Sequence, residues 1–269
     1  KDLLDRYQVV KVMELVHQVQ VELTGYSPFG DQKVLISHSM NPWYPTAQPI
    51  RYNLEGDYKI RKDFFSPLFL MTDQNVPRLL LDQLSRPIDA YHLTEETMIF
   101  LLFTHSLDKA INEYGNEISA EARNHFTEIS AKLNDGFRKA FERPFASNDH
   151  PGTHGGIEAI RKVAEDLGED IYKNFFHIWT YAESYAKANP KSINGTSIHE
   201  FLTKDNKGDS IQDYRLVGDT LIISALSAAS DKNLKPRFSE YNIDVHQELF
   251  NKTLPFFRNV LDYSKNTQK

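Results

Sequence analysis

The segment Met98-Ile99-Phe100-Leu101-Leu102-Phe103-Thr104-His105-Ser106-Leu107-Asp108 is apolar at most positions and contains neither Gly nor Pro. The tetrapeptide Thr94-Glu95-Glu96-Thr97 precedes it and has residue types that favour the start of a helix. Together these features predict a core helix that is buried on most of its sides.

Helical spacing recurs on both sides of this segment. Apolar residues fall three and four positions apart in residues 3–23, from the core segment onward to residue 141, and again in 245–261. The stretch 211–229 has the composition of another largely buried helix. The apolar positions from 157 to 182 predict one long helix. No segment alternates convincingly with a period of two, so the sequence predicts an all-α, helical bundle-like fold.

Two stretches are expected to connect these helices. Seven prolines interrupt short apolar pieces between Thr24 and Pro87, which predicts a long and mostly irregular connection over residues 24–90. A second loop, rich in Gly, Pro, Ser and Asn, covers 143–156. It predicts a boundary between an N-terminal helical region, 1–146, and a C-terminal helical region, 147–269; a single compact domain is the alternative.

The two halves also resemble each other in outline. The buried segments end in Asp108 and Asp231, and a helix with a histidine follows each, His125 after 17 residues and His246 after 15. This pattern fits two diverged copies of one helical unit.

The composition excludes several classes of function. With 37 acidic and 31 basic residues, the net charge of -6 argues against broad binding to nucleic acid or to an anionic membrane surface. No apolar run approaches the roughly 18 residues that span a bilayer. There is no Cys, which excludes thiolate metal sites and disulfides and suits a cytoplasmic setting. The chain begins at Lys1 without Met, so we expect it to be a segment of a longer protein.

No metal site and no cofactor are expected. The ten histidines include no HExxH or HxH spacing. The segment Asp205-Asn206-Lys207-Gly208-Asp209 has a misplaced Gly for a calcium loop, and Leu216 occupies the position of the bidentate Glu. It is therefore expected to form a turn.

The stretch His154-Gly155-Gly156-Ile157-Glu158-Ala159-Ile160-Arg161 carries the strongest chemical signal. A Gly-rich turn that leads into a helix exposes backbone N–H groups to an anion, which makes Gly155 and Gly156 candidate ligand-binding residues. His154, Glu158 and Arg161 share one helix face, and an arginine beside a histidine suits phosphoryl groups. The same pattern is also typical of an ordinary connector followed by surface charge pairing.

This stretch resembles the His-Gly-x-x-His-x-x-Arg helix of the phosphodiesterase domains in SidE-type effectors, which intracellular bacterial pathogens inject into host cells. The resemblance extends over about residues 143–263 through the order of the helices. In that family, histidines and a glutamate in a helical groove cleave the phosphodiester of ADP-ribosylated ubiquitin. The resemblance implies that His154, Gly155, Gly156 and Arg161 contact ligand, with an aromatic side chain near Tyr181 or Tyr185 beside the base.

Three departures from the family pattern bear on catalysis. Glu158 replaces the second histidine, Asp231 is the nearest equivalent of the glutamate, and the later histidine would fall beyond Lys269. The resemblance therefore implies an effector domain in the host cytosol that binds adenine nucleotides or ADP-ribose-like phosphoesters with little or no turnover.

Two alternatives remain open. One is a divergent active phosphodiesterase, with His154, Glu158, Asp231 and His246 as candidate catalytic residues. The other is a helical protein-interaction scaffold that docks a host protein and binds no nucleotide.

Overall fold

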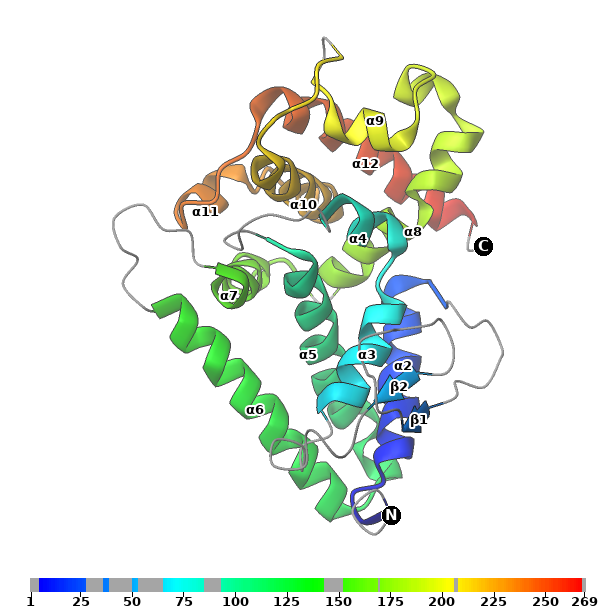
Figure 1. The fold of residues 1–269 in the computed structure, drawn as a ribbon, viewed down its shortest axis with the longest axis vertical. Helices are drawn as coiled ribbons and strands as arrows, with labels where there is room; N and C mark the ends of the chain where they lie inside the picture. Colours follow the sequence, from blue (N-terminus) through cyan, green and yellow to red (C-terminus); the bar gives the residue numbers. More distant parts are fainter. Residues whose placement is uncertain are drawn as a thin grey trace. The chain divides into compact units, whose positions relative to one another are not determined.

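The computed structural model describes residues 5–27, 36–38, 50–52, 65–84, 93–142, 152–168, 170–205 and 208–267. These residues are predominantly helical (Figure 1), which confirms the predicted all-α, bundle-like fold. Among them, the strands form one short parallel pair, β1 Ile36–His38 with β2 Ile50–Tyr52.

The chain forms two compact units. Unit 1 comprises Lys1–Glu22, Tyr26–Val76 and Ile99–Gly136, and unit 2 comprises Leu23–Gly25, Pro77–Met98 and Phe137–Lys269. The predicted boundary between residues 146 and 147 lies outside the described residues. The units instead divide the chain after Gly136, inside a helix that the sequence predicts as continuous.

Unit 1 is built mainly from helices that the sequence predicts. Helix α2 confirms the helix expected over 3–23, and α5 confirms the buried helix around 98–108, where Leu102 and Phe103 are completely buried. Helix α6 buries Ala122, Phe126 and Ile129 in this unit. The helices that lie wholly or mostly in this unit are α2 Val9–Thr24, α3 Phe65–Asn75, α5 Glu95–Tyr114, the 3₁₀ turn η1 Gly115–Glu117 and α6 Ala120–Glu142.

The expected irregular connection over 24–90 is wrong for its last part. Two helices form there, α3 in unit 1 and α4 Arg78–Leu84 in unit 2. Their prolines do not interrupt them because Pro67 is the third residue of α3 and Pro77 directly precedes α4. The first turn of a helix needs no backbone N–H donor within the helix, so proline is tolerated at both places.

Three helices form the core of unit 2: α8 Asp170–Ala188, α10 Tyr214–Ser230 and α12 Gln247–Thr267 pack against one another (Figure 1). Every residue of α10 from 217 to 229 is buried, as the sequence predicts for 211–229. Helix α12 confirms the amphipathic helix predicted over 245–261, and its Phe257 packs on Trp179 of α8 with ring centroids 5.2 Å apart. Besides α4, the shorter elements of this unit are α7 Gly152–Ala164, η2 Pro190–Ile193, α9 Ile198–Thr203 and α11 Lys235–Ser239.

The single long helix predicted over 157–182 is wrong. The chain makes two helices there, because α7 ends at Ala164 and α8 begins at Asp170. Between them, just before α8, Gly168 has φ +86°, a left-handed conformation that glycine adopts without a steric penalty and that turns the chain. The apolar spacing continues through this break, which is why periodicity alone misses it.

The two acidic residues of the predicted internal repeat occupy different positions. Asp108 lies within α5 and accepts hydrogen bonds from Ser130 and Asn134 of α6. Asp231 instead follows the last residue of α10 in a left-handed conformation, with φ 52°. The two helix ends are therefore not equivalent, and the duplication stays a prediction.

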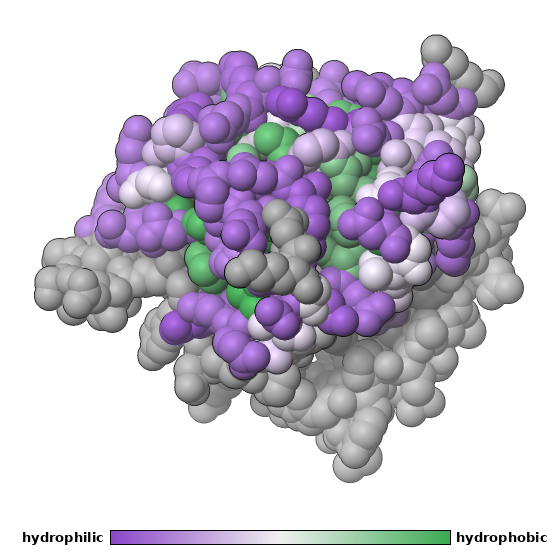
Figure 2. Space-filling view, turned by 90° about the horizontal axis from the view of Figure 1, so that it is seen from above, coloured by the Kyte–Doolittle hydropathy of each residue, from purple (hydrophilic) through white to green (hydrophobic). Residues whose placement is uncertain are grey.

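Hydrophilic side chains cover most of the described surface on the face shown in Figure 2, with hydrophobic residues between them. Within the described residues, the large hydrophobic side chains that are clearly exposed are those of Val10 and Tyr214. No helix in the described part of the chain is long and apolar enough to cross a bilayer.

Candidate functional site

The glycine pair expected to form an anion-binding turn lies inside a helix. Helix α7 begins at Gly152, so Gly155 ends its first turn and Gly156 begins its second, and both are buried. A helix leaves only about its first four N–H groups without an internal partner, and Gly156 lies beyond them. The predicted turn at the pair is therefore wrong, and the free amides of α7 belong to residues that precede Gly156.

Close packing explains why position 156 carries no side chain. A Cβ atom built on Gly156 would lie 2.8 Å from Cδ2 of Leu93, which is shorter than a carbon–carbon contact allows. Leu93 is itself buried, and its amide donates to Oδ1 of the buried Asp219 in α10 at 3.1 Å. Gly156 thus lets α7 approach the segment that leads into α5.

The polar face of α7 carries two of the predicted residues. Glu158 and Arg161 are half-buried, whereas Ile157 and Ile160, on the adjoining face roughly 100° around the helix, are completely buried. The backbone of His154 is helical, so the predicted spacing of its position with Glu158 and Arg161 holds, but its side chain lies outside what the structure describes.

Tyr172 of α8 lies within electrostatic range of this face. Burial raises the pKa of its phenol to about 12, the positive charge of Arg161 opposes that rise, and the negative charges of Glu158 and Glu165 add to it. Tyr172 therefore stays protonated at physiological pH, where its hydroxyl can donate a hydrogen bond. We call Arg161, Glu158 and Tyr172 the α7–α8 polar cluster.

The sequence analysis did not single out Tyr172. It lies 11 residues after Arg161 and on the next helix, beyond the turn at Gly168. Helical periodicity relates residues only within one helix, so no spacing rule connects the two.

Arg237 of α11 fixes the other end of α7. Its Nη1 donates to the carbonyl of Val163 at 2.9 Å and its Nη2 to the carbonyl of Lys162 at 3.1 Å, while the Asp166 carboxylate lies 3.6 Å from Nη2. The last carbonyls of a helix lack partners within it and carry partial negative charge, so a guanidinium satisfies both needs.

The candidate catalytic residues Asp231 and His246 do not come together. The His246 amide donates to Oγ1 of Thr220 at 2.8 Å, and its Nδ1 accepts from the Leu249 amide at 3.3 Å at the start of α12. Asp231 is exposed at the far end of α10, where it pairs with Arg258 at 3.1 Å. Thr220 and Asp231 are 11 residues apart in sequence. A helix rises about 1.5 Å per residue, so the two sites are separated by roughly 16 Å.

The aromatic residues expected beside a base have packing partners of their own. The Tyr185 ring lies 5.6 Å from that of Phe256 and 5.7 Å from that of Tyr263, both in α12, and the Tyr181 ring lies 6.0 Å from that of His177. Tyr185 is 13 residues beyond Tyr172 on α8, roughly 20 Å along the helix. It therefore lies away from the α7–α8 polar cluster.

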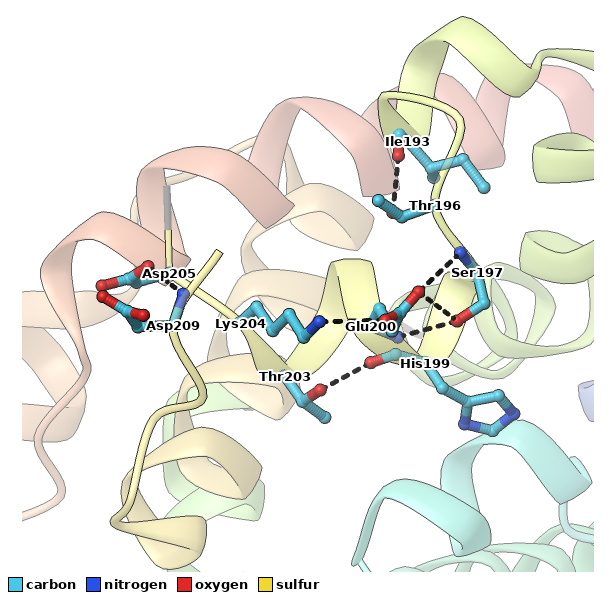
Figure 3. A network of polar contacts seen from close by, with 9 residues as sticks. All are labelled: Ile193, Thr196, Ser197, His199, Glu200, Thr203, Lys204, Asp205 and Asp209. Carbon is cyan, nitrogen blue, oxygen red and sulfur yellow. Dashed lines mark hydrogen bonds and ion pairs between the residues drawn. The ribbon is translucent and has the colours of Figure 1, made fainter. Parts of the chain in front are cut away.

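A second group of polar side chains surrounds α9 (Figure 3). Ser197 and Glu200 form a reciprocal capping box at its start, and Lys204 pairs with Glu200 at 2.9 Å. The predicted turn that follows is confirmed: the Asp209 amide donates to the Asp205 carboxylate at 2.9 Å. These contacts end a helix and close a turn.

In the described residues, no three or more His, Asp or Glu side chains gather in a way that could hold a metal ion. Comparisons with the models of known protein families, with curated proteins and with solved structures find nothing that matches this chain.

Proposed function

We propose that unit 2 binds an adenine nucleotide or an ADP-ribose-like phosphoester at the α7–α8 polar cluster, with little or no turnover. The observation that carries this proposal is that Arg161, half-buried on the polar face of α7, lies near enough to Tyr172 of α8 for its charge to act on the phenol. A guanidinium donates to phosphate oxygens in a forked geometry, and a phenol that stays protonated adds a neutral donor. The first amides of α7, near His154, supply further donors for an anion.

The carboxylate of Glu158 makes the site selective. It balances the positive charge of Arg161, so the cluster has no net charge and a free phosphate dianion gains little there. A phosphodiester carries less charge per phosphorus and offers a ribose hydroxyl that can donate to a carboxylate. The cluster therefore suits cyclic AMP or ADP-ribose, in which each phosphorus carries one negative charge, better than inorganic phosphate.

The distance between the candidate catalytic groups supports weak turnover. General acid–base catalysis needs both proton-transferring groups within hydrogen-bond reach of the substrate. Asp231 is paired with Arg258 at one end of α10, and the contact of His246 with Thr220 is roughly 16 Å away along that helix. Glu158 also replaces the second histidine of the motif that this stretch resembles.

The wider role follows from the same resemblance. An effector segment of this kind would act in the host cytosol and would bind a host protein in addition to the nucleotide. A binding function without cleavage would then hold a nucleotide or an ADP-ribosylated host protein rather than modify it.

Calorimetry with the whole chain tests the proposal directly. The ligands are AMP, ADP, ATP, cyclic AMP and ADP-ribose, with inorganic phosphate as the comparison. We expect Arg161→Ala to weaken nucleotide binding about tenfold or more, because it removes a charged donor, and Tyr172→Phe to weaken it less. His154→Ala tests the remaining predicted contact.

Lys187→Ala provides the matched control. It removes one positive charge from the exposed last turn of α8, roughly 22 Å along the helix from Tyr172. Binding that is lost in Arg161→Ala and kept in Lys187→Ala supports the site. Absence of binding to every ligand, or equal losses in both variants, would contradict it. Cleavage of ADP-ribose that disappears in His154→Ala would favour the active phosphodiesterase.

A further inference from the structure

Asn194 and Gly195 form the one Asn-Gly pair in the sequence. They lie in unit 2 between η2 and α9, and both residues are exposed. In such a pair the backbone nitrogen of the glycine can attack the side-chain carbonyl of the asparagine. Glycine permits this reaction best because it has no Cβ to hinder the approach.

The folded turn holds the two reacting atoms apart. Asn194 is left-handed, with φ 55° and ψ 26°. The Cβ of an L-residue is rotated by about 120° from its own nitrogen about the Cα–C bond, so the five-membered ring requires ψ near about -120°. The observed ψ places Cβ almost opposite the nitrogen of Gly195. Ring closure therefore needs a large rotation about that bond.

Hydrogen bonds hold the turn in this conformation. The Gly195 amide, which is the nucleophile, donates to the carbonyl of Pro190 at 3.0 Å, and the Asn194 amide donates to the carbonyl of Lys191 at 3.3 Å. The Thr196 hydroxyl donates to the carbonyl of Ile193 at 2.7 Å (Figure 3). Ile193 is buried and anchors the turn to unit 2.

We propose that Asn194 is a site of spontaneous deamidation that the turn from Pro190 to Thr196 keeps closed. When the turn opens, the Gly195 nitrogen bonds to Cγ of Asn194, the Cγ–Nδ2 bond breaks, and the Gly195 proton leaves with the amide as ammonia. Water then adds to either carbonyl of the succinimide, and cleavage of a ring C–N bond gives aspartate or isoaspartate. The net reaction consumes one water and releases one ammonia, without an oxidant or a catalyst.

The product changes this turn in two ways. The new carboxylate adds a negative charge at a place where the chain ends one helix and starts another. Isoaspartate also inserts an additional backbone carbon, so the hydrogen bonds from Asn194 and Gly195 to the η2 carbonyls cannot re-form in their present geometry. Deamidation is therefore expected to keep the turn open once it has occurred.

Rates of isoaspartate formation in the whole chain test the proposal. The native protein and the protein in urea are incubated side by side, and the product at residue 194 is measured by peptide mass and by enzymatic methylation of isoaspartate. We expect the native chain to react more slowly by about tenfold or more, because the rate follows the fraction of open turn. Asn194→Gln defines the background.

Two hydroxyl deletions separate the turn from general loosening. Thr196→Val removes the hydroxyl bond to the Ile193 carbonyl but keeps the Thr196 amide bond to the same carbonyl at 3.0 Å, and it should accelerate the native reaction. Thr203→Val removes a comparable bond, from its hydroxyl to the carbonyl of His199 at 2.7 Å within α9, and should leave the rate unchanged. Equal rates in native and unfolded chains, no product in urea, or equal rates in the two variants would overturn the proposal.

Discussion

Replacement of Gly156 by alanine tests whether packing, rather than ligand binding, accounts for this glycine. The added Cβ would lie 2.8 Å from Cδ2 of Leu93 and 3.8 Å from Cγ2 of Thr97. Overpacking of a core costs about 1–3 kcal/mol. Alanine recovers roughly 1 kcal/mol of that through its better helix propensity. We therefore expect unit 2 to lose about 1 kcal/mol of stability, since Leu93 is buried and has little room to move.

Gly136→Ala is the matched control, because this glycine lies inside α6 and its Cβ would meet nothing within 4 Å. Unit 1 should gain roughly 0.5–1 kcal/mol. Urea unfolding followed by circular dichroism measures both changes. The Leu93→Ala background removes the clashing methyl group, so Gly156→Ala should become neutral or stabilising there. An equal cost of Gly156→Ala with and without Leu93→Ala would refute the packing argument.

Three further measurements follow from individual side chains. Arg237→Ala leaves two α7 carbonyls without their charged donor and should destabilise unit 2 by about 1–3 kcal/mol in urea unfolding; an unchanged midpoint would contradict the capping role. Burial raises the pKa of Tyr172 above its ordinary value of 10, so the ultraviolet signal of tyrosinate formation up to about pH 10 should be the same in wild type and Tyr172→Phe. Burial lowers the pKa of His17 below its ordinary value of 6.5, so as the pH falls the unfolded chain binds this proton before the folded chain does. The free energy of unfolding of unit 1 should therefore keep its full value above about pH 6.5 and decrease as the pH falls below it. His17→Gln should reduce this pH dependence.

Helices buried on most of their sides were predictable because their composition alone identifies them. The stretches 98–107 and 221–229 are apolar at most positions and contain neither Gly nor Pro, and both form core helices. Helices α3 and α4 were not predictable in this way, since their prolines are signs of irregular structure in most contexts. Pro67 and Pro77 stand at helix starts, where proline is compatible with the helix, and only the tertiary fold determines that placement.

The candidate site could be predicted only where it depends on one helix. The shared face of Glu158 and Arg161 follows from their spacing, and α7 confirms that spacing. The partner on that face, Tyr172, depends on how the chain turns at Gly168 and returns as α8. For Asp231 and His246 the sequence prediction fails in the opposite way. The sequence suggests both as candidate catalytic residues, but they lie at different places along α10, and that helix keeps them apart. A site formed by side chains of different helices depends on how those helices pack, and the spacing of residues in the sequence does not show this packing.

Polar residues inside unit 1 show how much of that packing is directional. The hydroxyls of Thr72 and Ser106 donate to helix carbonyls, so they must accept from Gln20, whose Nε2 lies 2.7 and 3.0 Å from them. With its Nε2 group used in this way, the side chain of Gln20 turns its Oε1 toward Asn75. The Nδ2 atom of Asn75 lies 2.7 Å from Gln20 Oε1 and 2.9 Å from Nδ1 of His17. Asn75 must then donate to His17, which leaves Nδ1 an acceptor and the ring neutral. A proton on Nδ1 would face the Asn75 amide hydrogens, so this chain of bonds acts in the same direction as burial on the pKa of His17.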